Sequence, residues 1–204
     1  MSVPRHIVGI CGGSGSGKTT LVKLLYEKLS ATNSISLLSL DNYYKEIHLQ
    51  EKDVNGIVNF DLPTALHEEH LIHDLRLLKQ GIIVEREEYT FNVDVETPTL
   101  VQIKPADILL VEGLFVLHYP EMAELLTTSV FIEVDPVKQL ERRILRDKKE
   151  RGYSQEEIVY QWENHVIPCF ESYLYPYKEN ADFVISNDTY FEHGIQSLID
   201  HLSQ

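Results

Sequence analysis

The residues best suited to chemistry stand together near the N-terminus, in a stretch rich in glycine. In order they are Gly12, Gly13, Ser14, Gly15, Ser16, Gly17, Lys18, Thr19 and Thr20. The first eight fit the pattern G-x-x-x-x-G-K-[ST], whose glycines let successive backbone N–H groups turn inward ahead of a helix N-terminus. In this pattern Lys18 reaches the β- and γ-phosphates, and the Thr19 hydroxyl binds Mg²⁺. The stretch therefore predicts a loop that binds a nucleoside triphosphate.

Two acidic residues follow apolar runs that are typical of strands. Asp41 follows Ile35–Leu40, and Glu112 follows Ile108–Val111. Because ligands of parallel sheets bind beyond the carboxyl ends of the strands, we expect both side chains near the phosphate loop. Asp41 is predicted to align a substrate hydroxyl with the γ-phosphate and to take its proton, whereas Glu112 is predicted to help hold Mg²⁺ beside Thr19. The alternatives are a turn-forming Asp41 and a solvent-facing Glu112.

A dense group of basic residues runs from Lys138 to Arg151. Seven of the eighteen basic residues lie there against three acidic ones, a net charge of +4 in a chain whose total is −14. Arginines above a triphosphate neutralise charge on the transferring phosphoryl oxygens and exclude water. We therefore expect Arg143, Arg146 and Arg151 to form a lid at about residues 138–153. A solvated helix face with intrahelical ion pairs is the alternative, and it is what we expect of the lysines.

Short apolar runs alternate with amphipathic stretches along the chain. The runs lack polar alternation, as strands covered on both faces do, and they are Ile7–Cys11, Ile35–Leu40, Ile108–Val111, Val130–Val134 and Phe183–Ile185. Helical spacing, caps and amphipathic pattern indicate helices at Leu21–Leu29, at Leu71–Leu78, from Asp135–Pro136, from about Ser154 toward Pro168, and from about Tyr190. This alternation predicts an α/β fold of the P-loop NTPase type, with three layers and a mostly parallel five-stranded sheet.

The stretch from Gly81 to Pro105 departs from this alternation. Two short β-like segments, Ile82–Glu85 and Leu100–Ile103, flank the polar segment Arg86–Pro98. We interpret residues 81–105 as a small β-hairpin insertion at the edge of the sheet. No long linker and no internal repeat divides the sequence, so residues 1–204 are expected to form a single domain.

The net charge and the cysteine content of the chain indicate which kinds of partner and which compartment to expect. A net charge of −14 repels nucleic acids and acidic membrane surfaces, so we expect a small-molecule substrate. The two cysteines, Cys11 and Cys169, stand in no paired motif, which favours a reducing compartment. With no apolar stretch long enough for a membrane span, the expected location is the cytoplasm.

The sequence lacks the motifs of other nucleotide-dependent classes and of a zinc site. The Asn-Lys-x-Asp guanine reader of GTPases and the Ser-Gly-Gly signature of transport ATPases do not occur in it. His67 and His70 stand one residue too close together for the His-x-x-x-His zinc pattern. We expect these histidines to line the polar side of a helix.

Taken together, these motifs resemble those of the uridine kinases, within the wider uridine kinase and phosphoribulokinase superfamily. The resemblance covers nearly the whole chain and includes Gly12–Thr20, Asp41–Tyr44, Asn59–Pro63, Tyr89–Phe91, Val111–Gly113, Arg142–Gly152 and Val166–Pro176. It implies transfer of the γ-phosphoryl of ATP, with Mg²⁺, to the 5′-hydroxyl of a ribonucleoside such as uridine or cytidine. It also suggests a homo-oligomer.

The resemblance assigns roles to individual residues. Asp41 matches the catalytic aspartate of the family, and Arg146 and Arg151 match its lid arginines. Asp61 and Arg143 match positions that hold the sugar. Tyr89 and Gln161 match other positions of the substrate pocket.

The sequence departs from the family where the base is contacted. A histidine and an arginine of the family correspond here to Asp94 and Glu96, and a second arginine corresponds to Tyr153. Loss of these donors changes what the pocket can discriminate, and Asp94 suits a cationic ring such as that of nicotinamide riboside. Phosphoryl transfer is expected to persist, while the acceptor stays open. Sibling kinases of pantothenate or a sugar phosphate, and a nucleotide-binding regulator without catalysis, are the alternatives.

Overall fold

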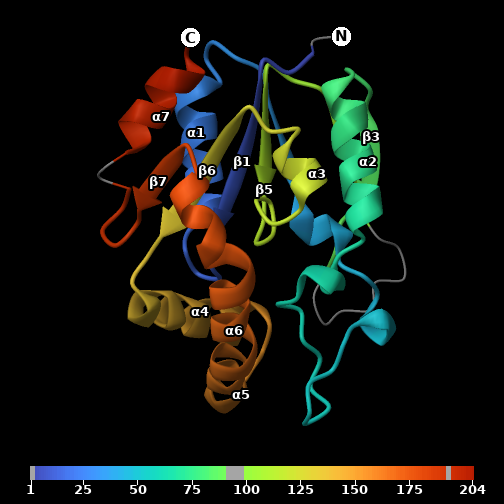
Figure 1. Cartoon of the computed structure of the whole chain (residues 1–204), viewed down its shortest axis with the longest axis vertical. Helices are drawn as coiled ribbons and strands as arrows, with labels where there is room; N and C mark the ends of the chain where they lie inside the picture. Colours follow the sequence, from blue (N-terminus) through green and yellow to red (C-terminus); the bar gives the residue numbers. More distant parts are fainter. Residues whose placement is uncertain (1–2, 91–98, 192–193) are drawn as a thin grey trace.

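A central parallel sheet organises the molecule, which a computed structural model describes for residues 3–90, 99–191 and 194–204 (Figure 1). The strand order is β2-β5-β1-β6-β7, and each of the four pairings is parallel. The strands are β1 (His6–Gly12), β2 (Ile35–Ser39), β5 (Ile108–Glu112), β6 (Thr128–Glu133) and β7 (Phe183–Ser186). The predicted five-stranded sheet is confirmed.

Apolar side chains on both faces explain why these segments are strands. All five residues of β5 are buried, and so are six of the seven residues of β1, as expected of central strands between helical layers. In the parallel register Glu112 lies beside Ile10 of β1 and beside Ser39 of β2. The carboxyl ends of these three strands therefore meet at one edge of the sheet.

Helices cover both faces of the sheet and give it three layers (Figure 1). On one face α1 (Lys18–Leu29) and α7 (Ile195–Leu202) bury leucines against β1, β5 and β6. On the other face α2 (Glu68–Lys79) buries leucines and α3 (Pro120–Ala123) buries Met122. The leucines predicted at helical spacing in Leu21–Leu29 and Leu71–Leu78 supply much of both contacts.

The remaining helices lie beyond the carboxyl ends of the strands (Figure 1). Helix α4 (Pro136–Glu150) carries the arginines, and it begins where predicted, with the Asp135 carboxylate accepting from the N–H of Val137 at 2.8 Å. Helix α5 (Gln155–Gln161) starts with a capping box at Ser154. It continues through a π-helical turn, Trp162–Val166, into α6 (Ile167–Cys169).

The helical path does not end near Pro168, as the sequence suggested, but runs on through a second π-helical segment, Phe170–Leu174. A proline inside a regular α-helix lacks one N–H and crowds the carbonyl four residues earlier. Here Pro168 stands in the first turn of α6, where the missing N–H costs least. The wider π turn ahead of it lets the helix continue.

The insertion forms a separate two-stranded antiparallel sheet of β3 (Val84–Glu87) and β4 (Leu100–Ile103). Strand β3 begins two residues later than the predicted Ile82. The reason is that the N–H of Ile82 bonds to the carbonyl of Leu77 at 2.9 Å and so closes the C-terminus of α2. The guanidinium of Arg86 on β3 pairs with the buried Asp74 of α2, which fixes this small sheet to the body.

The last helix also begins later than the sequence indicated. Tyr190 and Phe191 have positive φ angles, 122° and 53°, which an α-helix does not contain. Helix α7 therefore starts at Ile195, after Gly194 at φ 95°.

Candidate active site

The phosphate loop leaves β1 at Gly12 and enters α1 at Lys18. Gly15 and Gly17 have positive φ angles of 77° and 96°, which other residues adopt only under strain. A Cβ atom on Gly15 would also lie 2.6 Å from the carbonyl oxygen of Gln139. Glycine is therefore required at both positions for the loop to curl beneath α4.

Residues distant in sequence support the loop from outside. The side-chain amide of Asn187, which follows β7, donates to the carbonyl of Ser16 at 2.8 Å. The guanidinium of Arg142 on α4 donates to the carbonyls of Asn187, at 2.9 Å, and of Gly15, at 3.4 Å. These contacts occupy the carbonyls of Ser16 and Gly15, while the N–H of Ser16 bonds to the carbonyl of Gly13 at 3.1 Å, so the loop is held in its curled form.

Lys18 and Thr19 are the first two residues of α1, directly after the phosphate loop. The Nζ of Lys18 donates to the carbonyls of Gly12 and Gly13, at 3.0 and 3.2 Å. Thr19 is exposed, and both side chains line a cavity of about 100 Å³. Thr20 lies one residue further along α1 with an exposed side chain.

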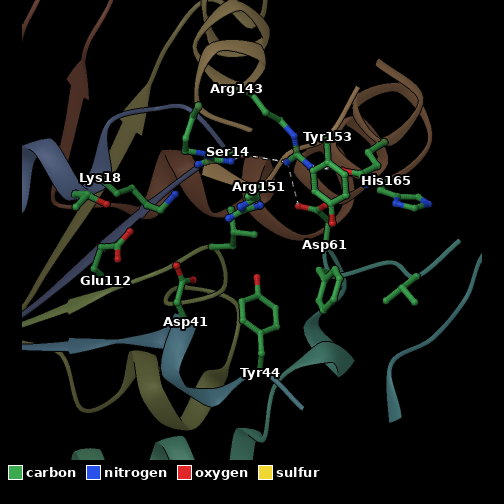
Figure 2. A pocket seen from close by; sticks show the side chains of 16 residues that line it. Ser14, Lys18, Asp41, Tyr44, Asp61, Glu112, Arg143, Arg151, Tyr153 and His165 are labelled. Carbon is green, nitrogen blue, oxygen red and sulfur yellow. Dashed lines mark hydrogen bonds and ion pairs between the residues drawn. The ribbon is translucent and has the colours of Figure 1, made fainter. Parts of the chain in front are cut away.

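The cavity brings together most of the residues predicted from the sequence (Figure 2). It lies between the phosphate loop, the carboxyl ends of β2 and β5, and helices α4 and α5. The predicted residues that line it are Ser14, Lys18, Thr19, Asp41, Asp61, Glu112, Arg143, Arg146, Arg151 and Gln161. Tyr89 stands behind this lining, with its ring centroid 5.4 Å from that of Tyr44. Asp94 and Glu96 lie outside the described residues.

Two carboxylates face the phosphate loop. Glu112 is 7% exposed, and its side chain accepts from the hydroxyl of Ser39 at 3.5 Å. Burial raises the pKa of Glu112 from 4.5 to about 7; the negative charge of Asp41 adds to this effect and Lys18 opposes it. Asp41 itself is exposed and points into the cavity from the turn after β2 (Figure 2). A cation bound beside Glu112 would therefore favour its charged form.

One buried carboxylate organises the arginines. Asp147 on α4 has no exposed surface, and it lies within ion-pair distance of Arg143, Arg146 and Arg151, at 3.3, 2.7 and 3.6 Å. The guanidinium groups of Arg143 and Arg146 also reach the hydroxyl of Ser14, at 3.0 and 3.4 Å. Burial, followed by repulsion from Arg146, lowers the pKa of Arg151. Asp147 and Ser14 thus hold the arginines over the loop.

Away from the loop, the cavity offers donors and acceptors for hydroxyl groups. Arg143, 5% exposed, donates to the side-chain oxygen of Gln161 at 2.9 Å and lies 4.0 Å from the carboxylate of Asp61. A carboxylate, an amide and a guanidinium side by side suit vicinal hydroxyls, which both donate and accept.

Three residues of the site were not singled out from the sequence. Asp147 was counted only as a charge, although its place four residues after Arg143 and next to Arg146 is a signal for ion pairing. Asn187 supports the loop from a position 171 residues away, which no local pattern reveals. His165 lines the cavity four residues after Gln161, on the same face of the helix.

The part of the chain that the structure describes holds no cluster of three His, Cys, Asp or Glu side chains able to bind a metal. His67 and His70 stack on each other at 5.0 Å, and His67 lies 3.5 Å from the carboxylate of Glu46. Among the described residues no helix is long and apolar enough to cross a membrane.

Comparison with known proteins places these features in one family. The model of the phosphoribulokinase / uridine kinase family matches residues 7–189. The uridine kinase of Brevibacillus brevis is 33% identical over 184 residues, covering 90% of this chain and 86% of the relative. The uridine kinase of Staphylococcus epidermidis is 34% identical over 179 residues, covering 88% and 86%.

Solved structures agree on the fold. The phosphoribulokinase of Rhodobacter spheroides aligns with a TM-score of 0.68 at 14% identity, over 91% of this chain and 71% of that one. At this identity the likeness concerns the fold alone. The family match and the two sequence relatives go further: this chain belongs to the phosphoribulokinase / uridine kinase family.

Proposed function

We propose that this chain transfers the γ-phosphoryl group of ATP to the 5′-hydroxyl of a ribonucleoside, with uridine or cytidine as acceptor. The observation that carries the proposal is a single cavity with a phosphate loop at one end and the group Asp61, Arg143 and Gln161 at the other. Asp41 lies between them. The uridine kinases that share a third of its residues support the choice of acceptor.

ATP would bind with its phosphates in the loop. The N–H groups of residues 13–19, the N-terminus of α1 and Lys18 provide positive charge there. Within the described residues, the hydroxyl of Ser16 is buried without a hydrogen-bond partner, which fits a loop built to receive ligand oxygens. Arg146 and Arg151, held by Asp147, would face the γ-phosphoryl group and neutralise its charge.

The oxygen groups beside the loop fit Mg²⁺. Thr19 offers an exposed hydroxyl, and Glu112 offers a buried carboxylate. Burial raises the pKa of Glu112, and a bound cation would favour its charged form. Oxygen ligands of this kind are the ones that Mg²⁺ prefers. Bound there by Thr19 and Glu112, the ion would supply charge neutralisation for the β- and γ-phosphate oxygens.

The acceptor would bind beyond Asp41. Its ribose hydroxyls would meet Asp61, Arg143 and Gln161, which leaves the 5′-hydroxyl directed toward the γ-phosphate. Asp41 would accept a hydrogen bond from that hydroxyl and hold it in line. The new O5′–P bond forms as the bond from the γ-phosphorus to the β–γ bridging oxygen breaks, and the hydroxyl proton passes to Asp41. ADP and a nucleoside 5′-monophosphate are the products.

An acceptor panel tests this proposal. ADP release from ATP and Mg²⁺ is measured with uridine, cytidine, nicotinamide riboside, pantothenate and ribulose 5-phosphate, and the phosphorylated product is identified by mass. We expect uridine or cytidine to give the highest kcat/KM. Turnover restricted to pantothenate or the sugar phosphate would show a sibling kinase. ATP binding without stimulation by any acceptor would show a nucleotide-binding regulator.

A further inference from the structure

A buried histidine stands at the end of the cavity opposite the phosphate loop (Figure 2). His165 is 2% exposed, and it lies four residues after Gln161. Residues four apart share one face of a helix, and the π turn Trp162–Val166 keeps this relationship. Both Gln161 and His165 line the cavity. Local π-helical turns occur frequently at functional sites.

One ring nitrogen of His165, Nε2, is hydrogen-bonded to the carboxylate of Asp53. The Nε2 of His165 lies 2.8 Å from Oδ2 of Asp53. The same carboxylate accepts from the hydroxyl of Tyr160 at 2.7 Å and from the N–H groups of Asn55 and Ile57, each at 2.9 Å. These hydrogen bonds, that of Tyr160 first among them, hold the pKa of Asp53 well below its usual value. Asp53 can then only accept, so Nε2 of His165 carries the proton.

The second nitrogen is left for a ligand. When the imidazole is neutral and Nε2 is the donor, Nδ1 carries a lone pair and accepts hydrogen bonds. Among the described residues Nδ1 has no hydrogen-bond partner, since the contact with Asp53 through Nε2 is the one polar contact of the ring. His165 lines the cavity, so a ligand N–H in the cavity can donate to this acceptor.

The surroundings of His165 suit a flat ring. Val58, Phe60 and Tyr153 line the same cavity and present apolar or aromatic surface. Val58 pairs with Lys52 across the turn that carries Asp53. The same turn therefore provides a lining residue of the cavity, Val58, and the carboxylate that contacts His165. The planar part of an acceptor held by Asp61 and Gln161 at its sugar would enter this space.

We propose that His165 reads the ring of the acceptor, by accepting a hydrogen bond at Nδ1 from a ring or amino N–H, and that Asp53 is a positioning residue that fixes the tautomer. The inference rests on the proposed function, because it places the sugar at Asp61, Arg143 and Gln161. It adds a specificity-determining residue within the same cavity.

Two substitutions separate the two ring nitrogens. In His165→Gln, the amide reaches the former place of Nε2, so the contact with Asp53 is kept while the group at Nδ1 is lost. In His165→Asn, the amide stands near the former place of Nδ1, so an acceptor is kept there. Thermal unfolding of both variants checks that the fold is intact. We expect kcat/KM for the acceptor to fall about tenfold or more in His165→Gln and less in His165→Asn, with KM for ATP unchanged.

Modified acceptors show whether the lost contact is to an N–H. Uridine is compared with 3-methyluridine, and cytidine with N4,N4-dimethylcytidine, since methylation removes the N–H donor in each case. The wild-type protein should prefer the unmethylated acceptor about tenfold or more, and His165→Gln should lose most of that preference. An equal preference in the wild type and in His165→Gln would overturn the assignment of His165 while leaving nucleoside phosphorylation in place. If the wild type phosphorylates none of these nucleosides, the proposed function fails, and the inference fails with it.

The role of Asp53 has a readout of its own. Two-bond ¹H–¹⁵N correlation spectra distinguish the tautomers of a neutral imidazole. We expect the Nε2–H form at His165 in the wild type, and a change in the tautomer signals in Asp53→Asn, whose side chain can donate to Nε2. Addition of the preferred nucleoside should shift the Nδ1 resonance in the wild type. A wild-type spectrum of the Nδ1–H form would contradict the proposal.

Discussion

The carboxylate of Asp147 accepts a hydrogen bond from Nε of Arg146 at 2.7 Å, with no exposure to solvent. Two further arginines, Arg143 and Arg151, lie around the same carboxylate. Such a cluster brings several positive charges to the phosphate loop without leaving them unpaired in the protein interior. The basic stretch that stands out in an acidic sequence thus has one organising residue.

Removal of this carboxylate should cost both stability and activity. Asp147→Asn leaves up to three guanidinium groups without their shared partner, so we expect a loss of about 3 kcal/mol in the free energy of unfolding. We also expect kcat/KM to fall about 10- to 100-fold, because Arg146 and Arg151 lose their fixed positions. Urea unfolding and steady-state kinetics measure the two effects.

Helix α4 offers a matched control for this variant. Glu150 lies on the same helix and is exposed, so Glu150→Gln should change the free energy of unfolding by less than about 0.5 kcal/mol. Asp147→Asn with stability and kinetics as close to wild type as those of Glu150→Gln would refute the organising role of Asp147.

Lys18 should be indispensable for phosphoryl transfer. Its Nζ lies against the carbonyls of Gly12 and Gly13, from which it can reach phosphate oxygens. We expect Lys18→Ala to lower kcat by about 1,000-fold or more, since charge stabilisation of this kind supplies several kcal/mol. Lys23→Ala, which removes an exposed lysine of α1, is the control and should keep wild-type activity. Normal turnover of Lys18→Ala would refute the assignment of the phosphate loop.

Glu112 predicts a pH dependence of stability for the protein free of metal and nucleotide. Burial raises its pKa from 4.5 to about 7, so between these values the folded protein binds more protons than the unfolded chain. The contribution of Glu112 to stability must therefore fall as pH rises from 4.5 to 7, by about 3 kcal/mol, and stay level above pH 7.

Substitution of Glu112 isolates this effect. Glu112→Gln cannot ionise, so it should lose this part of the pH dependence and be more stable than wild type above pH 7. Urea unfolding in EDTA across this pH range measures the difference. Parallel curves for the two proteins would show that Glu112 does not titrate as described.

The sequence predicted the parts of the site that local chemistry determines. A glycine-rich loop between a strand and a helix, and acids at the ends of apolar strands, are local patterns, and parallel strands bring their carboxyl ends together. Asp41, Glu112 and the loop therefore lie together as expected. The cap of α4 at Asp135 follows equally local rules.

Other parts depend on contacts between distant segments. The hydrogen bond from Asn187 to Ser16 spans 171 residues, and that from His165 to Asp53 spans 112. Strand β3 begins late because the N–H of Ile82 bonds to the carbonyl of Leu77 at the C-terminus of α2. Tertiary packing decides each of these features, so the pattern of neighbouring residues does not reveal them.

The central claim concerns Asp41, which should direct the acceptor hydroxyl toward a triphosphate held by the loop. Its direct test is Asp41→Asn, with Asp200→Asn, an exposed acid of α7, as control. We measure kcat with saturating ATP and nucleoside, and ATP affinity by calorimetry. The account predicts that Asp41→Asn lowers kcat about 100-fold or more while ATP affinity stays within about twofold of wild type. A kcat within about twofold of wild type would contradict it.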